Sequence, residues 1–282
     1  MRIEQMTGVF GAEIFDVDVK ALDETGFREV EQALLRHGVV AIRDQHLTPA
    51  DQLAFVRRFG DIHYHPHAKG LPEQPEVLEI LKTETDRDNF GGGWHTDQMF
   101  TPAPASYTCL YALELPPAGG DTVFACMRNA YRTLSPGMQR LAEGLRTENR
   151  SVAAQLAGRN QSAAKAFGSM RATDAPADEA PAVHPLVMRH PETGDPSLYI
   201  GLHTICFEDM TPEESRPLID WMMGHMTRPE NVCRLRWRLG TLAIWDNRSV
   251  LHNAINDYHG HRRRMHRITV TGAAPAAFAA AA

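Results

Sequence analysis

The sequence has few cysteines, and none is paired at short spacing. The four are Cys109, Cys126, Cys206 and Cys233, and no two of them form a C-x-x-C motif. This spacing argues against a cysteine zinc site and against a disulfide scaffold. It favours reduced thiols, which are usual inside cells. We therefore predict a cytoplasmic protein.

Long hydrophobic runs and an excess of positive charge are also missing. No stretch of about 18 consecutive apolar residues occurs, so we expect no membrane span. Residues 1–6 lack the apolar core of a secretory signal. The formal net charge is −6 and the pI is near 6.2. Such a chain has no overall field that would attract nucleic acid or an anionic membrane, so neither is an expected partner.

What remains is an ordinary globular composition. The chain has 282 residues, of which 43% are hydrophobic and 23% charged, enough to bury a sizeable core. All-β domains of this size commonly form one unit, so we predict a single catalytic domain over 1–282. Residues 150–181 break the pattern because they hold few large apolar side chains. A long segment of this kind is either a functional lid or a flexible insertion, and a plain surface insertion is the alternative.

Short strands outnumber helices in the predicted order of elements. Apolar residues at helical spacing, with capping residues before them, predict helices over 23–37, 48–59, two within 128–145, and one from 211. Alternating or short apolar runs predict strands at 38–43, 76–81, 105–115, 121–125, 182–188, 197–201, 233–237, 241–245, 250–252 and 264–271. This order predicts a mainly β fold with bracing helices, a double-stranded β-helix or jelly roll.

The stretch 91–100 carries an H-x-D triplet, His95 and Asp97. Two residues apart on a β-strand, these side chains would point to the same face. A distant third ligand, His252, would complete a set of metal ligands with two imidazoles and one carboxylate. That set leaves coordination positions open, as a non-haem Fe(II) oxygenase requires. A zinc hydrolase using the same three ligands and a water is an alternative, and so is a non-catalytic barrel that only binds a ligand.

Further blocks accompany the triplet, in a fixed order along most of the chain. The sequence resembles the taurine dioxygenase (TauD/TfdA) family in the blocks Leu35–Val40, Arg43–Gln45, Phe59–Asp61, Trp94–Asp97, Gly119–Thr122, Trp245–Arg248 with His252, Asp257–Tyr258 and Arg262–Arg267. Members of that family use Fe(II), 2-oxoglutarate and O2. The resemblance implies that His95, Asp97 and His252 hold the iron. It also implies that Arg263 and Thr122 hold the far carboxylate of 2-oxoglutarate.

The resemblance also implies a site for the prime substrate. Arg267 matches the family arginine that binds an anionic group of that substrate, and His65 matches a histidine beside it. Arg263 and Arg267 are four residues apart, so one face of a strand can present both. Phe207 is a further candidate for the pocket wall, although such a residue is more often core. Gly91 stands where the taurine enzyme has an asparagine, which favours an anion larger or more apolar than taurine.

The expected reaction is hydroxylation of a small anionic substrate with release of succinate and CO2. The classes implied are a sulfonate, a sulfate ester or a phenoxyalkanoate. The same iron site performing hydroxylation or desaturation in natural-product or amino-acid metabolism is the alternative. The resemblance further suggests a homo-oligomer, either a dimer or a tetramer.

Overall fold

The computed structural model describes residues 1–65, 68–151 and 180–278. Its α-helices are α1 (Glu24–His37), α2 (Pro49–Val56), α3 (Met127–Arg132), α4 (Pro136–Glu143) and α6 (Pro212–Met226), with short 3-10 turns η1 (Val19–Ala21), η2 (Arg57–Phe59) and η4 (Pro229–Asn231). The predicted lid or insertion at 150–181 falls almost wholly outside the described residues, so it stays a prediction.

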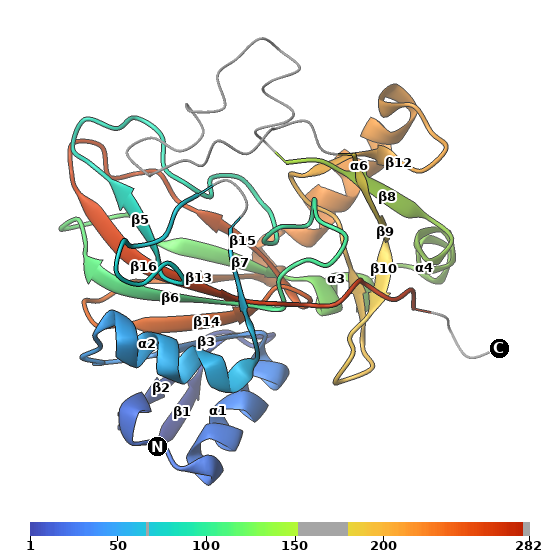
Figure 1. The fold of residues 1–282 in the computed structure, drawn as a ribbon. Helices are drawn as coiled ribbons and strands as arrows, with labels where there is room; N and C mark the ends of the chain where they lie inside the picture. The colour runs from blue at the N-terminus through green and yellow to red at the C-terminus, as the bar shows by residue number, and fades with distance from the viewer. Residues whose placement is uncertain (66–67, 152–179, 279–282) are drawn as a thin grey trace.

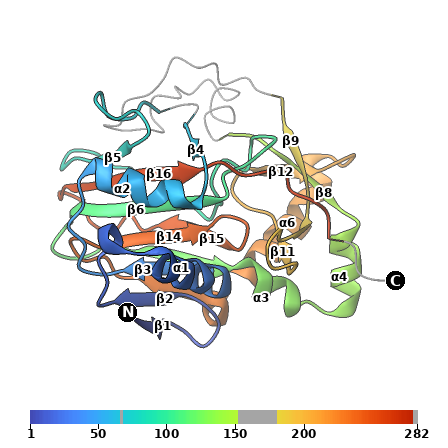
Figure 2. The same ribbon diagram turned by 60° about the horizontal axis from the view of Figure 1, so that its bottom comes forward.

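The largest layer is an eight-stranded sheet (Figure 1). Its order is β1-β2-β3-β14-β6-β16-β4, and β5 also pairs with β16. These strands are β1 (Arg2–Gln5), β2 (Ala12–Phe15), β3 (Val39–Ile42), β4 (Ile62–His63), β5 (Leu78–Lys82), β6 (Tyr107–Glu114), β14 (Leu242–Asp246) and β16 (Arg263–Val270). Helices α1 and α2 cover one face of this sheet, as Figure 2 shows from a second direction. The first hydrophobic core lies between these helices and the sheet.

A three-stranded sheet packs on the opposite face. It has the order β13-β7-β15 and consists of β13 (Val232–Leu235), β7 (Thr122–Cys126) and β15 (Val250–Ala254). Side chains of both sheets meet in a second core that includes Met265, Phe124, Trp237 and Trp245. Two facing layers of mainly antiparallel strands, closed around such a core, form the predicted jelly roll. The fold prediction is therefore confirmed.

A smaller group of elements flanks the two sheets (Figure 1). It contains the sheet β12-β8-β9 and the pair β10-β11, together with α3, α4 and α6. The strands are β8 (Arg146–Asn149), β9 (Ala182–Pro185), β10 (Val187–Arg189), β11 (Pro196–Leu198) and β12 (Thr204–Phe207). A third hydrophobic core joins these elements to β7 and β15.

The helix boundaries follow the capping residues that the sequence offers. The Asp23 side chain accepts from Gly26 N at the start of α1, and Gly38 ends that helix with φ +71°. Thr48 and Thr211 each form a capping box at the start of α2 and α6. Such caps satisfy the unpaired N–H groups of the first turn, so the predicted starts of these helices are confirmed.

The strand predictions needed correction in two respects. The predicted strand 182–188 is divided into β9 and β10, because Leu186 turns the chain and donates its N–H to Leu145 O at 2.9 Å. Strands β1, β4, β8 and β12 do not appear among the predicted strands. All four residues of β1 are exposed, so that strand shows no buried alternation from which it could be recognised.

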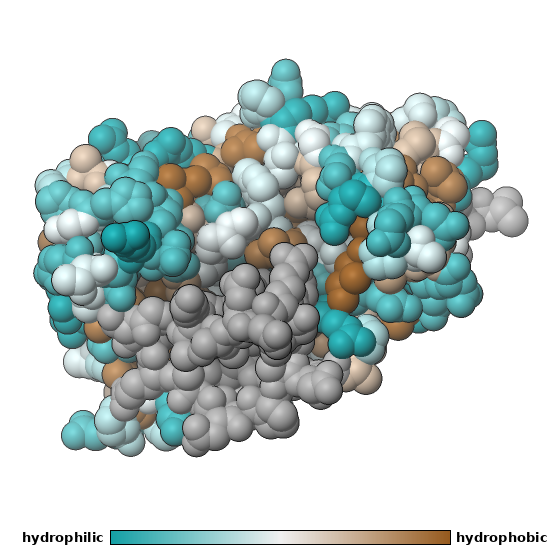
Figure 3. Space-filling view, turned by 90° about the horizontal axis from the view of Figure 1, so that it is seen from above, coloured by the Kyte–Doolittle hydropathy of each residue, from teal (hydrophilic) through white to brown (hydrophobic). Residues whose placement is uncertain are grey.

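The surface is mainly hydrophilic where the described residues are visible in Figure 3, and its hydrophobic residues form small separate patches. Scattered patches of this size are normal for a folded protein. Among the helices of the described segments, none combines the length and apolar character needed to cross a membrane.

Candidate metal centre

The three predicted metal ligands lie together in the structure. His95, Asp97 and His252 are buried, and their ligand atoms all lie within 4.8 Å of one another. Asp97 Oδ1 lies 3.8 Å from His95 Nε2 and 3.6 Å from His252 Nε2. Both rings therefore direct the same nitrogen toward one carboxylate oxygen. Two neutral imidazoles and a carboxylate form a donor set that suits a ferrous ion.

The H-x-D triplet is not on a regular strand, which corrects the sequence prediction. Only His95 forms an isolated bridge, and its partner is His252. Their backbones exchange two hydrogen bonds, His95 N to His252 O at 3.0 Å and His252 N to His95 O at 2.7 Å. Asp97 already lies in a turn, because the next residue, Gln98, has φ +57°. The bridge, rather than a strand face, brings the triplet to His252.

Burial sets the protonation of the two histidines. Burial lowers the pKa of His95, and burial followed by the nearby His95 lowers the pKa of His252 well below its ordinary value. The neutral imidazole is thus the favoured form. His95 Nδ1 lies 2.8 Å from Gly93 O, a contact that requires a proton on Nδ1 and leaves the Nε2 lone pair available. That lone pair is what a metal ligand needs.

Asp97 is held in its ionised form by its neighbours. Burial alone would raise the pKa of this carboxyl, but Arg267, His252 and His95 together hold it well below its usual range. Thr108 donates its hydroxyl to Asp97 Oδ2 at 2.6 Å. Asn247 Nδ2 donates in turn to Thr108 Oγ1 at 3.0 Å. The chain Asn247–Thr108–Asp97 fixes one carboxylate oxygen and leaves the other facing the histidines.

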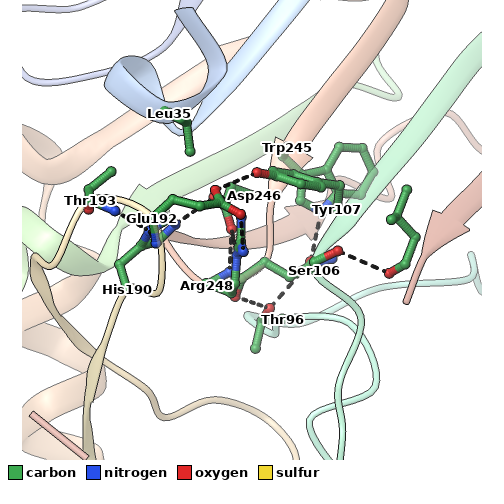
Figure 4. A network of polar contacts seen from close by, with 12 residues as sticks. Leu35, Thr96, Ser106, Tyr107, His190, Glu192, Thr193, Trp245, Asp246 and Arg248 are labelled. Carbon is green, nitrogen blue, oxygen red and sulfur yellow. Dashed lines mark hydrogen bonds and ion pairs between the residues drawn. The ribbon is translucent and has the colours of Figure 1, made fainter. Parts of the chain in front are cut away.

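A second group with metal-binding residue types lies behind the centre: His190, Glu192 and Asp246. Figure 4 shows the polar contacts that these three residues make with their neighbours. His190 Nδ1 accepts from two backbone N–H groups, and His190 Nε2 lies 2.8 Å from Asp246 Oδ2. Arg248 binds Asp246 and Glu192. Because both imidazole nitrogens already have partners, this group is a structural network.

The predicted co-substrate residues lie on the inner side of the barrel. Arg263 is only 5% exposed, and its Nε and Nη2 have no hydrogen-bond partner among the described residues. Thr122 is also buried, and its hydroxyl oxygen accepts from Trp237 Nε1 at 3.0 Å. The Thr122 proton therefore remains available for another acceptor. Unsatisfied buried guanidinium atoms are costly, so they indicate a missing anionic partner such as a carboxylate.

The predicted substrate residues border a cavity beside the metal centre. This cavity has a volume of about 440 Å³, and Arg267, His65, His63 and Lys69 are among its lining residues. Arg267 reaches both places, because its Nη2 lies 2.8 Å from Asp97 Oδ1. The Phe90 ring lies 5.9 Å from the His65 ring and 6.0 Å from the Arg267 guanidinium carbon. The structure thus places His65 and Arg267 on the wall of one cavity, and Arg267 connects that cavity to the metal centre.

Phe207 lies apart from this group. It has no exposed surface and packs in the third hydrophobic core, and its backbone N–H donates to Ser215 Oγ at 3.0 Å. Its position on β12 directs it against the helices, so we assign Phe207 to the core and drop it from the pocket.

Sequence reasoning missed one histidine near the centre. The ring of His203 lies 6.1 Å from the His95 ring and 5.0 Å from the Phe100 ring. Burial, followed by the nearby His95, lowers the pKa of His203 to about 3. No spacing or motif in the sequence marks this residue, because only the approach of the loop before β12 brings it to the site.

Comparison with known proteins agrees with this geometry. The model of the family described as "Taurine catabolism dioxygenase TauD, TfdA family" matches residues 2–269. An alkylsulfatase from Acinetobacter baylyi is 31% identical over 96% of this chain and 85% of its own. An alpha-ketoglutarate-dependent 2,4-dichlorophenoxyacetate dioxygenase from Cupriavidus pinatubonensis is 32% identical over 93% of this chain and 94% of its own.

A solved structure shows the same architecture with a metal and a ligand. The crystal structure of AAD-2 in complex with Mn(II) and N-oxalylglycine is 28% identical, with a TM-score of 0.78 over 97% of this chain and 98% of that chain. The family match covers almost the whole sequence, and the His-Asp-His centre is intact. This chain therefore belongs to the TauD/TfdA family and is an Fe(II)- and 2-oxoglutarate-dependent dioxygenase.

Proposed function

We propose that this dioxygenase hydroxylates a small organic anion with an apolar body, of the sulfate ester, phenoxyalkanoate or sulfonate class. The observation that carries the proposal is the position of Arg267, which lines the cavity and contacts the iron ligand Asp97. An anion paired with Arg267 has its adjacent carbon close to the metal. Ala68, Leu71, Pro72, Pro75 and Leu78 give the cavity apolar walls.

The residues divide the work of the reaction between them. When bound, Fe(II) with 2-oxoglutarate supplies the oxidising power, with O2 consumed and succinate and CO2 released. His95, Asp97 and His252 would hold the iron from one side. Arg263 and Thr122 would hold the far carboxylate of the co-substrate. Arg267 and His65 would position the prime substrate, and the buried site would keep water from the reacting carbon.

Arg263 and Arg267 are suited to separate ligands by their spacing. They lie on the same face of β16, four residues apart, which is about 13 Å along a strand. Met265 lies between them and is fully buried. At this backbone spacing each guanidinium group can meet a ligand of its own. This supports one arginine for the co-substrate and one for the prime substrate.

The direct test is succinate formation by iron-loaded protein with 2-oxoglutarate and O2. The panel contains medium-chain alkyl sulfates, phenoxyacetate and phenoxypropionate, alkylsulfonates including taurine, and amino acids. We expect one of the first three classes to raise succinate formation well above the rate without substrate, and taurine to be poor. The control is Asp97→Ala, which should bind no iron and make no succinate.

Different outcomes separate the alternatives. Stimulation by amino acids, and by no sulfate, sulfonate or phenoxyalkanoate, would favour the same iron site in natural-product or amino-acid metabolism. Activity with Zn(II) that needs no O2 would contradict the dioxygenase mechanism. Succinate formation that stays at background with every substrate would contradict the proposed substrate classes.

We also propose a single catalytic domain that assembles into a dimer or tetramer in the cytoplasm. The family match over residues 2–269 supports one domain. All four cysteines are buried and form no disulfide, which supports a reducing compartment.

Light scattering of the purified protein tests the proposed oligomeric state. A monomer at micromolar concentration would contradict the proposed dimer or tetramer.

A further inference from the structure

Lys82 is a buried cation to which the proposed reaction assigns no role. It is the last residue of β5, where Leu78, Ile80 and Lys82 alternate toward the barrel interior. Lys82 is only 3% exposed, and its Nζ has no hydrogen-bond partner within the described segments. Lysine is almost never buried to this degree without a partner, because transfer of an ammonium group from water is costly.

The partner of Lys82 across the sheet is Arg263. The register of β5 against β16 places the two residues directly opposite each other. Directly opposed side chains share a face, with Cβ atoms about 5 Å apart. Tyr258 lies beside both cations: Lys82 Nζ lies 4.2 Å from its ring centroid, and Tyr258 interacts electrostatically with Arg263. Two buried cations therefore lie side by side, and Lys82 Nζ and Arg263 Nε and Nη2 have no hydrogen-bond partner among the described residues.

The acid that acts on Arg263 already has another partner. Asp121 is the nearby acid that acts on Arg263, but its Oδ2 already accepts from Arg234 Nε at 2.7 Å. Two buried positive charges repel each other, and both need acceptors. A carboxylate has two oxygens and about four acceptor positions. It can accept from a guanidinium, a hydroxyl and an ammonium together.

We propose that Lys82 is a second cationic contact for the far carboxylate of 2-oxoglutarate, acting beside Arg263 and Thr122. This inference rests on the assignment of that carboxylate to Arg263. Lys82 would then contribute to the selection of a five-carbon diacid. A 2-oxo acid without a far carboxylate would leave Lys82 unpaired, and a shorter diacid bound at the iron would not reach it.

The test measures binding without turnover. Calorimetry on Mn(II)-loaded protein without O2 gives the Kd of 2-oxoglutarate and of 2-oxopentanoate, which has a methyl group in place of the far carboxylate. Lys82→Met removes the charge and keeps the chain length, Lys82→Arg keeps the charge, and Lys20→Met is the exposed control. We expect Lys82→Met to weaken 2-oxoglutarate about tenfold or more, and to leave 2-oxopentanoate within twofold. Lys82→Arg should retain most of the affinity.

The comparison of the two ligands decides the proposal. Equal losses for both ligands in Lys82→Met would show a merely structural lysine, and unchanged 2-oxoglutarate binding would also overturn the proposal. If Lys82→Met does not fold, the same ratio measured on Lys82→Gln decides it. Arg263→Met tests the underlying assignment separately. If Arg263→Met leaves 2-oxoglutarate binding intact, that assignment fails. If Arg263→Met weakens 2-oxoglutarate binding and Lys82→Met does not, only the role of Lys82 is rejected.

Discussion

At the residue scale, the centre depends on side chains that never touch the metal. Thr108 is the clearest example, because it donates to Asp97 Oδ2 at 2.6 Å and accepts from Asn247. Removing such a supporting hydrogen bond leaves a buried carboxylate oxygen without a partner. The carboxylate group is then free to rotate away from its metal-binding orientation. Outer hydrogen bonds of this kind commonly change metal affinity by about 10–100-fold.

We therefore predict that Thr108→Val weakens Fe(II) or Mn(II) binding by roughly 10–100-fold while the fold is retained. Valine keeps the shape of threonine and lacks the hydroxyl group. Metal titration monitored by calorimetry measures the change. Thr147→Val is the matched control, since Thr147 is a fully buried threonine in β8 of a different sheet. Equal metal affinity in wild type and Thr108→Val would show that Asp97 needs no such support.

The two arginines of β16 give a second prediction at this scale. Arg263→Ala should raise the 2-oxoglutarate requirement far more than the substrate requirement, and Arg267→Ala should do the reverse. Loss of one partner of a buried charge-assisted pair costs about 2–5 kcal/mol, or roughly 30-fold or more in affinity. Steady-state KM values for both ligands measure this.

Arg264 provides the control for this pair. It lies on the same strand but faces outward, 3.8 Å from Glu79 and 3.9 Å from Glu114 in partly exposed ion pairs. Such pairs contribute little, so Arg264→Ala should leave both KM values unchanged. Similar shifts of both KM values in Arg263→Ala and Arg267→Ala would refute separate roles. Because Arg267 also contacts Asp97, a metal titration of Arg267→Ala checks that its KM change does not come from altered iron binding.

At the scale of elements, the turn between β14 and β15 aligns the centre. Strand β14 ends at Asp246, the turn begins with Asn247, and β15 carries His252. Burial would raise the pKa of Asp246, yet Arg248 and His190 hold it well below its usual range. A carboxyl with a lowered pKa stabilises the fold above its unfolded pKa near 3.8, and this contribution is lost as the pH falls below that value. At neutral pH the Asp246 carboxyl is therefore ionised.

We predict that Asp246→Asn lowers the free energy of unfolding at pH 7 by about 3–5 kcal/mol, because Arg248 then loses its buried counter-charge. Urea unfolding followed by circular dichroism measures this. Asp195→Asn is the control, since Asp195 pairs with Arg128 at 3.3 Å through a half-exposed carboxylate and should cost at most about 1 kcal/mol. Similar losses in both variants would show that the turn does not depend on its buried charges.

The elements that sequence could predict are those with local causes. Caps such as Thr48 and Thr211 are read from neighbours within four residues, and the alternation of Arg263, Met265 and Arg267 follows from strand geometry alone. The triplet at His95 was placed wrongly on a strand because its course depends on Gln98 in a left-handed turn and on His252, far along the chain. His203 could not be found, since only tertiary packing brings it near His95.

At the scale of the whole molecule, burial of many neutral histidines makes stability depend on pH. Burial lowers the pKa of His37, His63, His95, His184, His203, His252 and His266. Below the ordinary value of 6.5 the unfolded chain binds protons that the folded chain does not. Stability rises with pH wherever the unfolded state binds more protons, so the metal-free protein loses stability as the pH falls through this range.

His203 allows this to be tested at one residue, because burial lowers its pKa to about 3. Between pH 7 and pH 5 its contribution to the free energy of unfolding should fall by about 2 kcal/mol, since one pKa unit corresponds to about 1.4 kcal/mol. His203→Gln cannot take up this proton, so wild type should lose about 2 kcal/mol more than the variant over that interval. Urea unfolding of EDTA-treated protein at both pH values measures the difference. Phe100→Leu alters packing against the same ring without removing a titrating group, so its loss should match wild type. An equal pH dependence in wild type and His203→Gln would mean that His203 takes up its proton equally in the folded and unfolded states. That result would contradict the lowered pKa of His203.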